Sequence, residues 1–147
     1  MKQLSFMFFQ SNDYFGHGFN FDEAASEDGI DFTKYNCILT GEYKYKTDND
    51  LEVVAENLYN EMCYCHANSV QGWVDSQYYE ECTRSSSGEY LEQVTQSRAF
   101  KHYPTQGDIV ALLGYGPGHI EILYINDFGF VRTRFNPHAD TKLIKEA

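Results

Sequence analysis

The sequence predicts a single α+β domain over residues 1–147: a mainly antiparallel sheet with one principal helix, residues 50–66, packed on it. Three observations predict it. Residues 106–135 hold three short apolar runs separated by glycine-containing turns, a pattern typical of consecutive strands. Residues 50–66 carry apolar side chains at helical spacing. The chain has 147 residues, 42% of them hydrophobic, which suffices for one buried core, and no linker divides it.

The first 46 residues predict two strands with a loop between them. Residues 1–9 alternate loosely between apolar and polar side chains, and residues 35–45 form a second such region that is thoroughly apolar only in its first half. Residues 12–31 mix glycines, acids and aromatics without a clean period. They predict a long loop, with a short helical turn over 22–26.

The helix has the strongest local pattern. Asp48, Asn49 and Asp50 offer side chains that cap a helix N-terminus. A stripe of apolar residues follows at spacings of three and four, while intervening polar residues face away. The stripe consists of Leu51, Val54, Leu58, Met62 and Cys65, and the outward residues are Glu52, Glu56 and Asn60.

The middle of the chain is less distinct. In residues 68–88 the first half is compatible with a helix and the second half, which ends in a serine run, with a loop. Residues 89–100 fit neither the helical nor the strand period, so both a second helix and an extended segment remain open. Pro104 ends this stretch before the last strands begin.

The last three strands differ in their patterns. The run 109–113 is apolar at both parities, which predicts a strand in the middle of a sheet with both faces covered. The run 120–125 returns after a turn at 114–118. The run 130–135 places Arg132 and Arg134 on one parity, which predicts an outer strand with one wet face.

Charge is the strongest compositional signal. The chain holds 22 acidic and 11 basic side chains, a net charge of −11, and residues 1–73 contribute −8 of it. A negative surface repels phosphates and so disfavours direct binding of nucleic acid. It favours a basic partner instead, including a nucleic-acid-binding protein. The alternative is that the acids only keep the protein dispersed in solution.

Compartment is predicted from what the sequence lacks. The apolar run at residues 6–9 is too short for a secretory signal, and no stretch approaches the length of a membrane span. Four cysteines in a chain of this size are expected to be free thiols in a reducing compartment. The sequence therefore predicts a cytoplasmic protein that does not bind membranes.

Several strand and turn signatures resemble the YodL-like domain, a small module of mobile genetic elements. The segment YNCILTGE at 35–42, the helix after it, and then GDIVALL and YINDFGF carry the resemblance. It covers about half of the chain, and the insertion at 50–103 is longer than in that family. The resemblance implies an origin in a mobile element and no catalytic residue. The matching positions are Tyr35, Gly41, Glu42, Asp108, Ile109, Val110, Leu112, Tyr124, Asp127, Phe128, Gly129 and Phe130.

Two groups of potentially reactive residues give weaker signals of function. His119, which opens the strand 120–125, resembles the histidine of NlpC/P60 and CHAP-type cysteine peptidases. A thiolate nucleophile favours a helix N-terminus, however, and Cys63 and Cys65 lie near a helix end. Cys63, Cys65, His66 and the downstream Cys82 are zinc-ligand types at poor spacing. We therefore expect buried free cysteines, with no metal and no cofactor.

The remaining candidate is an acidic binding surface. We expect a non-enzymatic anti-defence inhibitor of anti-CRISPR or anti-restriction type, which binds a basic host protein or nucleoprotein complex through carboxylates that mimic phosphates. The alternatives are a cysteine hydrolase that uses His119 and an accessory protein-interaction module. The expected partner-binding residues are Asp13, Asp22, Glu23, Glu27, Asp28, Asp31, Glu52, Glu56, Glu80 and Glu81, on one face with Asp48, Asp50, Glu61, Glu89 and Glu92.

Overall fold

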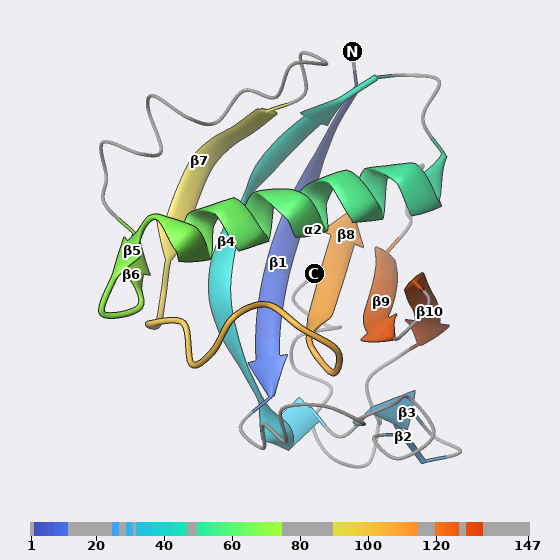
Figure 1. Ribbon diagram of the computed structural model, residues 1–147. Helices are drawn as coiled ribbons and strands as arrows, with labels where there is room; N and C mark the ends of the chain where they lie inside the picture. The colour runs from blue at the N-terminus through green and yellow to red at the C-terminus, as the bar shows by residue number, and fades with distance from the viewer. Residues whose placement is uncertain are drawn as a thin grey trace.

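Six antiparallel strands form the main sheet, in the order β10-β9-β8-β1-β4-β7, and the helix α2 (Leu51–Ala67) lies across one face of it (Figure 1). This computed structural model describes residues 2–11, 25–26, 29–30, 32–46, 50–74, 90–114, 120–126 and 129–133. The predicted α+β class is confirmed. The strands of the sheet are β1 (Lys2–Ser11), β4 (Tyr35–Tyr45), β7 (Tyr90–Gln96), β8 (Ile109–Leu113), β9 (Ile120–Asn126) and β10 (Gly129–Thr133).

The two longest strands, β1 and β4, pair along their whole length at the centre of the sheet. Phe6 lies opposite Gly41, and a side chain at Gly41 would meet the Phe6 ring at 2.9 Å. Position 41 needs a glycine because the Phe6 ring occupies the space where a side chain would lie. The register shifts between Phe8 and Phe9, where a β-bulge interrupts the ladder.

The predicted positions of β8 and β10 are confirmed. β8 lies between β1 and β9, and its residues are buried on both faces: Val110 and Leu112 on the helix side, Ile109 and Ala111 on the other. β10 is one of the two edge strands, and the side chain of Arg132 is 68% exposed. The helix side of its neighbour β9 contributes Leu123 and Ile125 to the main core.

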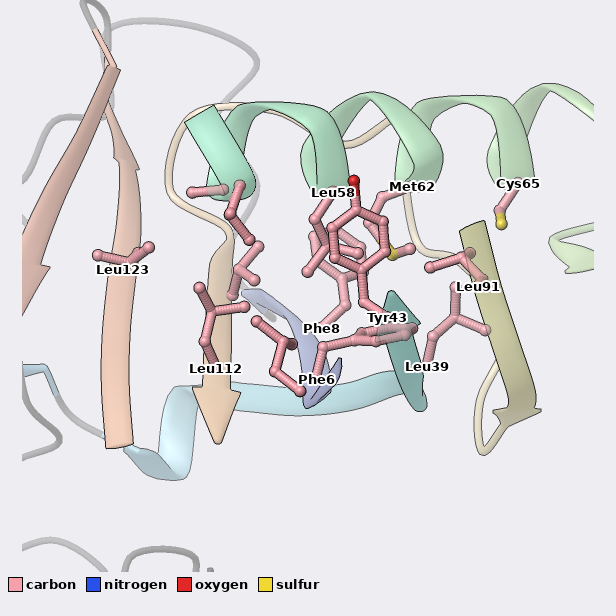
Figure 2. Packing of buried hydrophobic residues seen from close by; sticks show 14 of the residues in the cluster. Phe6, Phe8, Leu39, Tyr43, Leu58, Met62, Cys65, Leu91, Leu112 and Leu123 are labelled. Carbon is pink, nitrogen blue, oxygen red and sulfur yellow. The ribbon is translucent and has the colours of Figure 1, made fainter. Parts of the chain in front are cut away.

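α2 begins where the sequence predicts it. The side chain of Asp50 accepts a hydrogen bond from the Val53 amide at 3.0 Å, which caps the first turn. Leu58, Met62 and Cys65 point from the helix into the aromatic and aliphatic layer of the sheet (Figure 2). The helix crosses the strands from the β10 side of the sheet towards β7.

The connection between β7 and β8, residues 97–108, covers the same face of the sheet beside α2 (Figure 1). Phe100 is buried in the main core, and the Tyr59 hydroxyl of the helix donates to the Pro104 carbonyl at 2.8 Å. The ring of His66 meets those of Phe100 and Tyr103 edge-on, at 5.4 and 5.3 Å between centroids. Helix and connection therefore form one layer.

Three predictions in the less distinct segments are settled. Residues 69–74 form a hairpin of β5 (Ser69–Val70) and β6 (Trp73–Val74), so the predicted helical start of 68–88 is wrong. Gln71 and Gly72, both with positive φ, make its turn. The extended alternative holds for 90–96, which is β7. Ala25–Ser26 is β2, paired with β3 (Gly29–Ile30), so these two residues are not in a helical turn; a 3-10 turn, η1 (Phe32–Lys34), precedes β4.

Candidate functional site

Of the ten acids predicted to bind a partner, the structure describes Glu52 and Glu56. Both are exposed on the outer side of α2. They lie four residues apart, which places them about 6 Å apart along the helix axis. Asn60 and Tyr64, also exposed, continue the row. The other eight acids lie outside the described residues: Asp13, Asp22, Glu23, Glu27, Asp28, Asp31, Glu80 and Glu81.

The acids are divided unevenly between the described residues and the rest of the sequence. The described residues hold eight acids and seven bases, so their net charge is −1. The chain total of 22 acids and 11 bases leaves 14 acids and four bases, a net charge of −10, for the remaining positions.

Two acids expected on the negative face are elsewhere. Glu61 is buried, with only 8% of its surface exposed, so it is not part of an outer helix face. Glu92 lies opposite Glu42 in the ladder, on the sheet face away from α2, and forms an ion pair with Lys44 at 3.1 Å. The expectation of a single negative face is wrong for these two residues. Glu42 on that face also accepts hydrogen bonds from Ser5.

An open groove of about 510 Å³ lies between the start of α2 and the β9–β10 edge of the sheet. Its apolar part consists of Leu51, Leu123 and Phe130, and its charged rim of Asp50, Glu52 and Arg132. Phe130 and Arg132 are two residues apart on β10 and so project from the same face, and Leu123 lies opposite Arg132 in the ladder. The groove therefore joins one of the predicted acids to residues far away in sequence.

The charges on the rim differ in their partners. Arg132 pairs with Glu121 of β9, with Nε 3.4 Å from the carboxylate. Asp50 already accepts the Val53 amide. Glu52 has no ion pair with any described residue, and its Oε1 lies 3.8 Å from the position of a Cβ built on Gly129. The Glu52 carboxylate therefore stands beside the β9–β10 turn at the mouth of the groove.

A second group of polar residues is buried where β1 ends and β8 begins. The Gln10 amide nitrogen donates to the His102 carbonyl at 2.8 Å and to Asp108 Oδ2 at 3.2 Å, and its oxygen accepts the Lys101 amide at 2.8 Å. The same Asp108 oxygen accepts the Thr105 amide at 3.0 Å. These bonds attach the 97–108 connection to the central strand.

Among the acidic side chains of the described residues, the carboxyl of Asp108 has the most strongly shifted pKa. It is fully buried, and burial raises the pKa of its carboxyl to about 8, although hydrogen bonds from Thr105, Gln10 and Ser11 lower it in part. Asp108 Oδ1 lies 3.8 Å from His102 Nε2. With a pKa near 8, the carboxyl holds a proton at neutral pH and lies in a packed hydrogen-bond network that attaches the 97–108 connection.

Two of the described cysteines, Cys37 and Cys65, are poor nucleophiles. Burial raises the pKa of the Cys37 thiol to about 11, and Cys65 is fully buried in the core. Cys63 faces the 97–108 connection. Its side-chain hydrogen bond with Tyr103 is the largest cause of the raised pKa of that tyrosine. These three cysteines are free. His119 and Cys82 lie outside the described residues, so the cysteine hydrolase alternative stays a prediction.

Within the described ranges, no group of three His, Cys, Asp or Glu residues is arranged to hold a metal ion. Cys65 points into the core while Cys63 and His66 are half-buried on another side of α2, so these three do not converge. In the same ranges, no helix has the length and apolar character needed to span a membrane.

Comparison with known proteins gives no relative. No protein-family model matches the chain, and no curated protein or solved structure matches it. The resemblance to the YodL-like domain stays a prediction on the strand and turn signatures given above.

The sequence pattern predicts neither the groove nor the buried network. It places Phe130 and Arg132 in an outer strand and Asp108 at the start of another, without a link to Glu52 or Gln10. The missing information is the direction in which α2 crosses the sheet and the path of residues 97–108. The available signal in the sequence is that Phe130 and Arg132, two residues apart on one strand, project from the same face of the sheet.

Proposed function

We propose that this protein acts by contact, as a non-enzymatic inhibitor from a phage or other mobile element. It binds a basic host protein of the nucleic-acid-binding kind through carboxylates that take the place of phosphates. The observation that carries the proposal is the net charge of −11, from 22 acidic and 11 basic side chains, together with the exposed carboxylates of Glu52 and Glu56 on the outer side of α2. Such an excess of acids attracts cations over a distance of about 10 Å at 0.1 M salt.

The outer row of α2 supports the same reading. Glu52 and Glu56 are exposed one turn apart, and Tyr64 adds an exposed aromatic side chain, a residue type enriched in protein interfaces. Neither glutamate has an ion pair with a described residue that would neutralise it. Such exposed carboxylates are the groups that a basic partner would contact under this proposal.

The test is capture from a nuclease-treated bacterial lysate on the immobilised protein, followed by elution with increasing salt. We expect basic nucleic-acid-binding proteins to be retained and then released as salt rises to about 1 M, where the screening length falls to about 3 Å. The matched variant replaces Asp22, Glu23, Glu27 and Asp28 by Asn or Gln, which keeps size while it removes four charges. This variant should release the same proteins at lower salt.

The proposal fails if both proteins retain the same set of proteins to the same salt concentration. It also fails if the retained proteins are not basic, or if their release does not depend on salt. Treatment with nuclease removes nucleic acid that would otherwise bridge the two proteins.

A further inference from the structure

We propose that the groove at the start of α2 receives an arginine side chain of the basic partner. The inference rests on the proposed function, because it names the group by which such a partner is recognised at a described site. The groove, of about 510 Å³, is within the size range of ligand pockets, which runs from about 300 to 1,000 Å³.

The lining matches the two ends of an arginine. Leu51, Leu123 and Phe130 offer an apolar surface for the aliphatic stem. Phe130 is also an aromatic ring in the lining, the group with which a cation makes a cation–π contact, and it lies edge-on to Tyr59 with 6.4 Å between centroids. At the rim, Glu52 offers a carboxylate without an ion pair among the described residues.

Among the described residues, Arg132 is the one basic side chain that lines the groove, and the partner of its guanidinium decides which ligand charge fits. Its guanidinium is paired with Glu121, a residue outside the groove lining. The two carboxylates of Asp50 and Glu52 therefore exceed the positive charge that faces a ligand. An anionic ligand would have to approach both of them, so charge complementarity favours a cation.

Arginine fits better than lysine. The planar guanidinium stacks on an aromatic ring and forms two parallel hydrogen bonds with a carboxylate, and it is more weakly hydrated than an ammonium group. An ammonium would lose more hydration on entering a groove with a largely apolar floor. Arginine is also enriched at protein interfaces and in proteins that bind phosphates.

The experiment is a titration of the ¹⁵N-labelled full-length protein with arginine blocked at both ends as N-acetyl-arginine methylamide, followed by amide chemical shifts. We expect saturable shifts at Leu51, Glu52, Gly129 and Phe130, with a Kd on the order of millimolar. The equally blocked citrulline, which has the same shape without the charge, should leave these amides unshifted. Glu52→Gln should weaken the Kd roughly twofold to fivefold.

Glu92→Gln is the matched control, because it removes one negative charge on the opposite face of the sheet and should keep the wild-type Kd. Equal shifts with citrulline or an unchanged Kd in Glu52→Gln would overturn the inference. Salt-sensitive capture of basic proteins without arginine binding would overturn the groove and leave the proposed function in place. Arginine binding without such capture would leave the groove as a site for arginine and overturn the proposed function.

Discussion

At the scale of single residues, the burial of Asp108 is the most consequential feature. A carboxyl with no exposed surface is tolerated here because its oxygens accept hydrogen bonds from Gln10 and Thr105 and because it holds its own proton near neutral pH. The residue closes the turn at 105–108 and connects it to β1. Its protonation state should therefore govern how firmly the 97–108 connection is attached.

Asp108 should make the protein less stable as pH rises. In the unfolded chain its carboxyl loses the proton near the ordinary pKa of 3.8, whereas in the folded protein it does so near 8. Between these values the folded state binds more protons, so the free energy of unfolding falls as pH rises, by up to about 1.4 kcal/mol per pH unit. Above the folded pKa this stabilisation is lost.

Asp108→Asn tests this directly, because an amide imitates the protonated carboxyl and does not titrate. We expect the variant to gain stability relative to the wild type as pH rises from 5 to 7, measured by urea unfolding at each pH. A difference between the two proteins that stays constant over this range would show that Asp108 is ionised in the folded state.

At the scale of elements, α2 is both the cover of the core and the carrier of the described acids. Its inward row buries Leu58, Met62 and Cys65 against the sheet, and its outward row exposes Glu52 and Glu56. Its start is fixed by the Asp50 cap, which also sets the position of the groove rim. The geometry of the proposed site thus depends on one capping residue.

Replacement of Asp50 tests that dependence. Asp50→Ala removes the acceptor for the Val53 amide and should lower the free energy of unfolding by about 1 kcal/mol. Asp50→Asn keeps an oxygen that accepts the same hydrogen bond, so we expect it to stay within about 0.5 kcal/mol of the wild type. Both are measured by urea unfolding at pH 7. Equal losses in the two variants would show that the cap is not the cause.

The elements that the sequence predicted well are those with a complete local pattern. α2 has an apolar stripe and a capping residue, and β8 is apolar at both parities, so each was located to within a residue or two. The hairpin at 69–74 was missed because its strands are only two residues long and have no period. Glu61 was placed outside because helical spacing alone does not show which flank of α2 the sheet and the 97–108 connection bury.

The candidate site was predictable only in part, for a different physical reason. Glu52 and Glu56 follow from helical spacing, but the groove depends on the angle at which α2 crosses β9 and β10. That angle results from packing between residues such as Leu51 and Phe130, about eighty positions apart in the sequence. No local pattern encodes it.

At the scale of the whole molecule, the sheet packs two apolar clusters, one on each of its faces. The sequence as a whole carries 22 acidic and 11 basic side chains, a net charge of −11. An excess of carboxylates of this size is the property on which the proposed contact with a basic partner depends.

Displacement of nucleic acid is the measurement that tests this account most directly. A basic protein captured from the lysate is purified and bound to a labelled DNA duplex, and the present protein is then added at several salt concentrations. The account predicts that it displaces the duplex, at concentrations that increase with salt and are higher for the variant that lacks Asp22, Glu23, Glu27 and Asp28. A stable ternary complex that retains the duplex would contradict it.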